Sequence, residues 1–314
     1  MALTTPSSMG GTAASSITKG LTRKGLDAKS KVIEILLVLA LGAAMLILVV
    51  LLIDLLVRSW PVWTERPGDF LTSPLNSQNA AQAGVWQGIK GTLMLMAIVV
   101  VVSFPLGIAC AVYLEEYAST SRFARWTRIN VRNLAGVPSI VYGLIGLAIF
   151  VKAMGGVTGG KTVFAGGLAL SALVLPIVII TTSEALRAVP RSIREGAFGV
   201  GATQWETVRS HVLPSAAPGI LTGTVLSLAR AAGEAAPVLL VGAATGLLIT
   251  GKQTLWEQLT GPFTAMPVII FSYARQPAEE FRQATAAASL VLLVLVLLMN
   301  GFAVWLRNRY ERKW

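Results

Sequence analysis

The 314-residue sequence has few charged residues, one cysteine and one histidine. Charged side chains make up 13% of the chain, whereas soluble domains carry about 25%, so most classes of soluble protein are excluded. The single cysteine, Cys110, cannot form a disulfide within the chain and says nothing about the redox compartment. The single histidine, His211, is isolated from other metal-ligating residue types, and we expect no metal site.

Apolar residues are abundant instead. They form 54% of the chain, and the mean hydropathy is +0.69. Disordered chains are poor in apolar residues, so disorder is excluded for most of the sequence. A net charge of +11 can indicate nucleic-acid binding, but that function does not need so much hydrocarbon. The composition therefore predicts an all-α polytopic membrane protein whose basic residues lie in its loops, with the lipid bilayer as a partner and no nucleic acid.

Six stretches are long and apolar enough to cross a bilayer, which takes about 20 residues. All but one lack Asp, Glu, Lys and Arg, and the fifth contains Arg230 and Glu234. The expected transmembrane helices cover residues 35–53, 92–114, 134–151, 163–183, 216–241 and 284–306. The apolar run 267–271 is too short to cross and is expected in a loop.

The distribution of lysine and arginine predicts the orientation of the chain. Most of the 26 basic residues lie in the N-terminal tail, in the loops after the second and fourth spans, and at the C-terminus. Cytoplasmic loops carry an excess of these residues, so both termini are expected in the cytoplasm. After Glu115 and Glu116, arginine recurs at positions 122, 125 and 128, a pattern typical of a helix that faces anionic lipid headgroups.

Residues 155–162 read GGVTGGKT and satisfy the phosphate-loop pattern G-x-x-x-x-G-K-[ST]. A phosphate loop follows a β-strand, whereas this segment follows an expected transmembrane helix. The predicted orientation also places it outside, away from cytoplasmic ATP, and no apolar strand ends in an acidic metal ligand. We therefore interpret the match as fortuitous and the segment as a glycine-rich external hairpin. This interpretation argues against the alternative that the chain is itself an ATPase.

The loop between the fourth and fifth spans contains two candidate helix starts. Ser192 with Glu195, and Thr203 with Glu206, have the spacing of capping boxes. Gly201 lies between them, where a helix would end in a left-handed residue. The pattern predicts two short helices hinged at Gly201, with Glu195 capping the first and Glu206 the second.

This loop resembles the EAA motif, E-A-A-x3-G-x9-I-x-L-P, of bacterial ABC-importer permeases. The matching residues are Glu195, Ala197, Gly201, Leu213 and Pro214. Gly196 replaces the first alanine, and His211 stands where isoleucine is usual, but the register is intact. In such permeases the loop is the coupling helix, which docks in a cleft on the ATP-hydrolysing subunit. The resemblance implies that role for the five matching residues.

Arg230 and Glu234 are separated by four residues within an apolar span, so they share one helix face. A charge at mid-bilayer costs at least ~2.5 kcal/mol and usually marks a pathway. Arginine suits an oxyanion because its planar fork can bond two oxygens. Pro237 removes the backbone donor that would bond Gly233, so a kink is expected there. The pair is either a substrate-pathway site for an anion or a structural ion pair that holds two helices together.

Three further segments, ARAAGEAAP (229–237), the loop 263–281 and VPSIVYGLIG (137–146), narrow the resemblance. Together they are similar to the PstA-type permeases of phosphate-specific ABC importers, over about residues 85–306. The resemblance implies the type I ABC importer permease fold, inorganic phosphate as substrate, and Arg230 with Glu234 as the pathway pair. It implies a homologous second permease (PstC-type), two ATPase subunits (PstB-type) and an external phosphate-binding protein (PstS-type) as partners. It places the chain in the bacterial inner membrane.

This chain is then expected to hold no cofactor and no catalytic residue, with ATP and Mg bound by the partner subunits. The expected organisation is a flexible cytoplasmic tail (1–30), a first helix with its external loop (31–84), a permease domain (85–306) that contains the coupling loop (184–214), and a basic cytoplasmic C-terminus (307–314). A permease for molybdate or sulfate is the nearest alternative. An anion channel or unpowered carrier could use Arg230 but would not need the doubly capped loop.

Overall fold

The computed structural model describes residues 28–118, 121–248 and 254–310. It contains two compact units that divide within helix α2 (Ala28–Glu65), after Asp54. Most of the expected N-terminal tail, and the last four residues of the expected basic C-terminus, lie outside the described residues. Each unit is described here by itself.

Residues 28–54 of the first unit form one apolar helix rich in leucine, isoleucine, valine and alanine, and its side chains are exposed from Ser30 on, apart from Leu52, which is half-buried. Leucine and alanine favour helix strongly. At about 1.5 Å per residue, this stretch exceeds the ~30 Å of a bilayer core. The helix meets the length and hydropathy of a membrane span, as the sequence predicted for residues 35–53.

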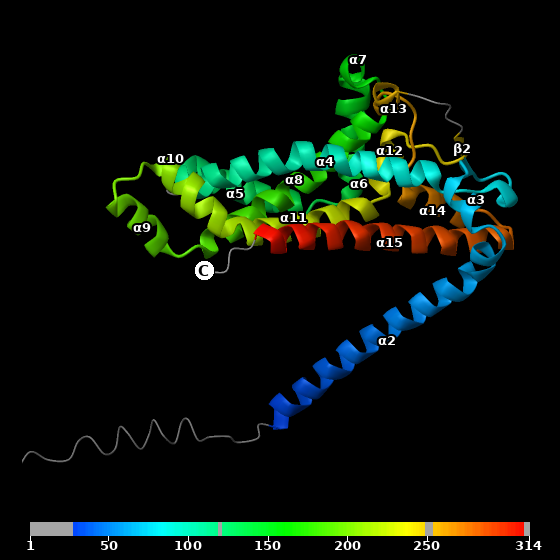
Figure 1. Cartoon of the computed structure of the whole chain (residues 1–314), viewed down its shortest axis with the longest axis horizontal. Coiled ribbons are helices and arrows are strands. Elements are labelled where there is room, and N and C mark those ends of the chain that lie inside the picture. Colours follow the sequence, from blue (N-terminus) through cyan, green and yellow to red (C-terminus); the bar gives the residue numbers. More distant parts are fainter. Residues whose placement is uncertain (1–27, 119–120, 249–253, 311–314) are drawn as a thin grey trace, which may run out of the picture. The chain divides into compact units, whose positions relative to one another are not determined.

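The second unit is built around four long helices that run side by side (Figure 1). They are α4 (Trp86–Val112), α8 (Val163–Ala188), α11 (Leu213–Gly233) and α15 (Glu279–Tyr310). Each lies in a segment long and apolar enough to cross a membrane. The expected helices at 92–114, 163–183 and 284–306 are thereby found.

Helices α4 and α8 form the centre of this bundle. Leu95 and Val99 of α4 pack with Leu170 and Val174 of α8, and all four side chains are fully buried. A buried leucine or valine contributes about 1.5–3 kcal/mol when it leaves water. In a bilayer the lipid already surrounds apolar groups, so close packing rather than burial favours this pairing.

The third expected span is not one straight helix. The chain forms α5 (Arg122–Ala135), then turns by 101° into α6 (Ser139–Gly146), which continues as the π-helix η3 (Leu147–Ala153). Pro138 causes the corner, since it disfavours helical backbone in the residue before it. The hydroxyl of Tyr142 donates to the Leu134 carbonyl across the corner, at 2.8 Å.

Short elements close the end of the bundle near α14 (Met266–Ala274), away from α9 (Arg191–Gly199) (Figure 1). They are α3 (Pro67–Thr72), η1 (Ala80–Gln82), α13 (Leu255–Leu259), α14 (Met266–Ala274) and two antiparallel two-residue strands, β1 (Leu75–Asn76) and β2 (Leu247–Leu248), in which Leu75 pairs with Leu248. The run 267–271, expected in a loop, lies in α14. Its side chains are largely buried, which explains why so apolar a run need not cross a membrane.

The remaining elements are η2 (Tyr113–Tyr117), α7 (Gly155–Thr158), α9 (Arg191–Gly199), α10 (Gln204–Thr207), η4 (Val208–Val212) and α12 (Ala236–Val241). Of these, η2 and η4 are π-helical turns at the ends of long helices. Such turns are rare and frequent at functional sites.

Tyr273 anchors the α14 end. Its ring is fully buried, lies 5.7 Å from the ring of Phe281, and its hydroxyl donates to the Gly84 carbonyl at 2.7 Å. Burial raises the pKa of Tyr273 to about 12. The unfolded group titrates near 10, so its contribution to stability is complete below about pH 10 and is lost as the pH rises toward 12.

Tyr273→Phe should lower the free energy of unfolding by about 1–2 kcal/mol, because it leaves the buried Gly84 carbonyl without its donor. The melting temperature in detergent measures this. Tyr113→Phe is the control, since that ring is half exposed and should give a wild-type value. Equal melting temperatures for Tyr273→Phe and the wild type would contradict the prediction.

Candidate functional site

The loop between α8 and α11 contains α9, and the end of this helix has the left-handed residue expected at Gly201. Gly201 has φ +86°, a left-handed conformation that favours glycine. Its N–H donates to the Phe198 carbonyl at 3.0 Å, and the Ala202 N–H donates to the Ala197 carbonyl at 3.1 Å. These two bonds form a Schellman motif, so the chain leaves α9 in a fixed direction.

The start of α9 differs from the expectation. Pro190 precedes the helix and no side chain caps it, so the predicted capping box of Ser192 and Glu195 is wrong. The extended ψ of Pro190, 142°, makes it the N-cap in place of Ser192 and starts the helix at Arg191, two residues earlier than predicted. Ser192 therefore lies within the first turn and cannot act as an N-cap. Glu195 is exposed, and Ala197 is the buried residue of α9.

The second capping box is present. The Thr203 hydroxyl accepts from the Glu206 N–H at 3.3 Å, and the Glu206 carboxylate accepts from the Thr203 N–H at 2.8 Å. The helix that starts here is not short, however. It continues through η4 into α11, so one helical segment runs from Gln204 to Gly233. Leu213 and Pro214 are the first two residues of α11. Pro214 has no backbone N–H to donate, and the π-helical turn η4 lies directly before α11.

Apolar side chains are exposed around the hinge. Phe198, Val200 and Trp205 all face solvent in this chain, and Val200 is 85% exposed. A contiguous exposed apolar patch rimmed by polar residues marks a protein interaction surface. These three exposed side chains, here called the apolar knob, could contact another protein.

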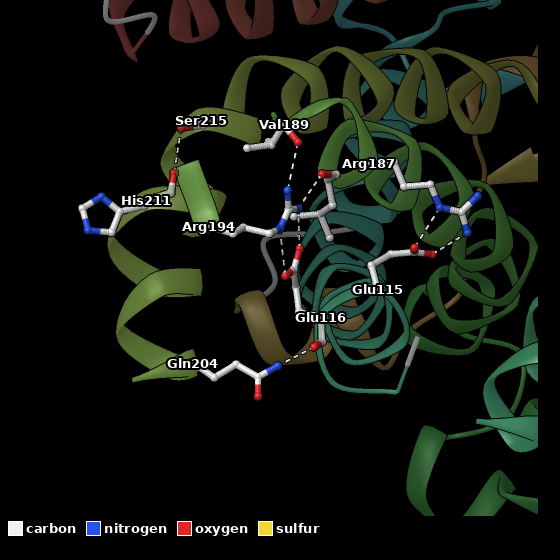
Figure 2. A network of polar contacts seen from close by, with 9 residues as sticks. Glu115, Glu116, Arg187, Val189, Arg194, Gln204, His211 and Ser215 are labelled. Carbon is white, nitrogen blue, oxygen red and sulfur yellow. Dashed lines mark hydrogen bonds and ion pairs between the residues drawn. The ribbon is translucent and has the colours of Figure 1, made fainter. Parts of the chain in front are cut away.

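A network of carboxylates and guanidinium groups lies where this loop meets the long helices (Figure 2). Glu115 of η2 accepts two hydrogen bonds from Arg187 of α8, at 2.7 and 2.8 Å. Arg128 of α5 also pairs with Glu115, at 3.4 Å between Nε and Oε1. Arginine 128 is therefore not a lipid-facing residue of the kind expected from its spacing, because it closes a contact between α5 and η2.

Glu116 is the centre of the second half of the network (Figure 2). It accepts from Nη2 of Arg194 at 2.7 Å and from Nε at 3.2 Å. The Gln204 side chain donates to the Glu116 backbone carbonyl. The sequence expectations missed this role of the two glutamates. Two carboxylates at the end of an apolar span could have signalled it, because a buried carboxylate needs a cationic partner.

Helix α11 carries the charged pair but ends earlier than expected. It stops at Gly233, Glu234 adopts an extended backbone (ψ 112°), and α12 starts at Ala236. The predicted kink near Pro237 is thus a complete break. Arg230 lies in the last turn of α11 rather than in the middle of a continuous helix.

Arg230 and Glu234 still meet across the break. Nε of Arg230 lies 3.6 Å from Oε1 of Glu234, and the side chains are 54% and 19% exposed. Among the described residues, no hydrogen bond engages the two terminal amino groups of Arg230. Its fork can therefore bind two oxygens of an anion while Nε stays beside Glu234.

Close packing of α6 positions the break. A Cβ on Gly143 of α6 would lie 2.8 Å from Pro237 Cα and 2.8 Å from Leu240 Cδ1, so only glycine permits this approach. The corner between α5 and α6 and the break between α11 and α12 thus support each other.

The GGVTGGKT segment has no phosphate-loop geometry. The residues before it are helical, in η3, and Gly155–Thr158 form α7. The Thr162 hydroxyl, which would bind magnesium in a phosphate loop, instead caps α8 through the Ala165 N–H and donates to the Thr158 carbonyl. The stem of Lys161 lies against Gly242. With these contacts, the segment does not have the structure of a phosphate loop.

No group of three or more His, Cys, Asp or Glu gathers in the part of the chain that the structure describes. His211 is exposed, and its backbone carbonyl accepts from the Ser215 hydroxyl at 2.7 Å (Figure 2). The described residues therefore contain no cluster of side chains of the kind that usually binds a metal ion.

Comparison with known sequences gives consistent results. A family model for the "binding-protein-dependent transport system inner membrane component" matches residues 103–312. The phosphate transport system permease protein PstA of Yersinia pestis is 37% identical over 225 residues, 72% of each chain. PstA 1 of Mycobacterium tuberculosis (strain CDC 1551 / Oshkosh) is 36% identical over 225 residues, 71% of this chain and 70% of that one.

Solved structures show the fold. The inward-facing MetNI methionine ABC transporter matches with a TM-score of 0.54 and 18% identity, over 73% of this chain and 95% of that chain. A bacterial alginate ABC transporter matches with a TM-score of 0.51 and 15% identity, over 71% and 78%. These likenesses confirm the expected helical permease fold of type I ABC importers. The chain is an integral inner-membrane protein and belongs to the family of binding-protein-dependent transport system inner membrane components, with PstA permeases among its relatives.

Proposed function

We propose that this chain is the permease subunit of an ATP-driven importer and forms half of its transmembrane path for inorganic phosphate. The observation that carries the substrate class is the free fork of Arg230 beside Glu234 at the break between α11 and α12. The names of its relatives, phosphate transport system permeases, support phosphate among the oxyanions.

The surface around Arg230 supports a path between two permeases. Thr222, Leu226, Arg230 and Gly233 are all exposed and follow one another at intervals of four, four and three residues, which places them on one face of α11. A charged residue on such a face usually lies toward a cavity or another subunit. We place a homologous second permease opposite this face, with the anion between the two chains.

The Schellman turn and the exposed apolar knob support docking on ATPase subunits. We assign Glu195, Ala197, Gly201, Leu213 and Pro214 to this coupling segment, which was expected within residues 184–214. ATP and Mg would then bind to two partner subunits, and an external binding protein would supply phosphate. Both termini would lie in the cytoplasm, with a first helix and loop (31–84) before the permease domain (85–306).

Uptake by the assembled transporter tests this proposal. Proteoliposomes that contain both permeases and the ATPase, with Mg-ATP inside and the binding protein outside, should accumulate radiolabelled phosphate at least about tenfold above vesicles without ATP. Unlabelled phosphate should compete, whereas sulfate and molybdate should not. Competition by either of these would make the chain a permease for that oxyanion.

Two controls separate the other functions. Equal uptake with and without ATP would indicate a channel or an unpowered carrier. The purified chain alone should hydrolyse no ATP, and intrinsic hydrolysis would contradict the assignment of ATP to partner subunits.

A further inference from the structure

Within the described residues, helix α9 is joined to the rest of the chain by one polar side chain. Among the described residues, Arg194 is its only side chain with a hydrogen bond. Ile193 packs partly against the apolar cluster below, and Ala197 is buried there. The faces of α9 that carry Phe198 and Glu195 are exposed.

Arg194 makes four hydrogen bonds, to two different elements. Two go to the carboxylate of Glu116 in η2, and two go to the carbonyls of Leu186 and Val189 at the end of α8, both at 2.9 Å (Figure 2). The last carbonyls of a helix lack partners within it and carry partial negative charge. Arg194 therefore caps α8 and clamps η2 with one guanidinium group.

The pair is also shielded from water. The Glu116 side chain is 9% exposed and that of Arg194 is 21% exposed. Charge-assisted bidentate pairs are stronger and more directional than neutral hydrogen bonds, and shielding from water strengthens them further. The planar fork of arginine fixes the angle between its partners, which lysine cannot do.

We infer that Arg194 is a positioning residue for transport: through Glu116 and the α8 carbonyls it fixes the coupling helix to the ends of α4 and α8, so that movement of α9 reaches the transmembrane bundle. This inference rests on the proposed function. It goes beyond docking, because Arg194 faces the chain's own helices and not the exposed knob.

The neighbouring Arg187–Glu115 pair differs from the Arg194–Glu116 pair, here called the clamp, in the elements that it connects. Arg187 and Glu115 form an equally bidentate contact, but both belong to the transmembrane bundle, and among the described residues no hydrogen bond or ion pair joins either of them to α9. Their contact joins α8 to η2 alone. Loss of that pair should therefore not separate the coupling helix from the bundle.

Arg194→Gln in the assembled transporter tests the inference. The ATPase subunit should still co-purify, and basal ATP hydrolysis should stay within twofold of wild type. Phosphate taken up per ATP hydrolysed should fall at least fivefold, as should the stimulation of hydrolysis by the binding protein. Glu116→Gln, which breaks the pair from its other side, should give the same result, and Arg194→Lys an intermediate one.

Arg191→Gln is the matched control, because Arg191 has the same charge, lies one turn away on α9 and is exposed. It should behave as wild type. An unchanged uptake per ATP in Arg194→Gln, or an equal loss in Arg191→Gln, would overturn the inference. So would loss of the ATPase subunit or absence of both clamp variants from the membrane, since Arg194 would then serve docking or folding. Failure of the wild-type complex to take up phosphate would instead refute the proposed function.

Discussion

Arg230→Gln should reduce phosphate uptake at least about tenfold while the transporter remains assembled. The substitution removes the guanidinium fork but keeps a polar side chain of similar length. Hydrogen bonds to charged groups contribute about 1.5–3 kcal/mol each, and 1.4 kcal/mol corresponds to a tenfold effect. Uptake of radiolabelled phosphate at saturating binding protein is the measurement, with co-purification of the ATPase subunit as the test of assembly.

Two variants sharpen this result. Arg230→Lys keeps the charge without the planar fork, so its uptake should lie between wild type and Arg230→Gln. Arg282→Gln is the matched control, because Arg282 pairs with Glu279 at 3.0 Å on an exposed helix start and should transport normally. Normal uptake by Arg230→Gln would show that Arg230 and Glu234 form only a structural ion pair.

Gly201→Val should weaken the association with the ATPase subunit about fivefold to tenfold, and uptake should fall with it. A side chain in the left-handed region costs roughly 1–2 kcal/mol, and a β-branched one suits it least. The space around Gly201 is open, so the strain arises from its φ of +86° and not from a clash. The expected outcome is a shifted or frayed α9 end. The ATPase retained on the purified permease is the quantity to measure.

Gly199→Val provides the comparison for this prediction. Gly199 also has open space around it, but it lies within α9 and lacks a positive φ. The same substitution there should raise helix propensity slightly, because glycine is a poorer helix former than valine, and should leave docking near wild type. Equal retention of the ATPase in the Gly199→Val and Gly201→Val variants would rule out a role for the Schellman turn.

The sequence was sufficient to predict those parts of the fold that depend on residues close together in the chain, namely the apolar helices and the helix caps. The apolar runs marked α4, α8 and α15, because a bilayer demands about 20 apolar residues. Gly201 and the Thr203–Glu206 box were also predictable, since capping depends on residues three or four apart. The same logic failed at Ser192, because Pro190 is the N-cap and the helix starts two residues sooner.

Contacts between distant residues could not be predicted in this way. The Glu116–Arg194 clamp joins residues 78 positions apart, and nothing in the spacing of either segment indicates the other. The break of α11 was expected only as a kink, since its completeness depends on the packing of Gly143 against Pro237. The pair of Arg230 and Glu234 was identifiable as a candidate site because its charges interrupt an apolar run, whereas the unbonded terminal amino groups of Arg230 became known only from the structure.

The exposed guanidinium of Arg230 also bears on the life of the chain before assembly. A newly inserted subunit without its partner would present this charge to lipid, at a cost of about 2.5–3.5 kcal/mol at the bilayer centre. Cover by a second permease would remove that cost. The side chain proposed to receive phosphate would thus also make the solitary subunit the less stable form, and so favour biogenesis in stoichiometric pairs.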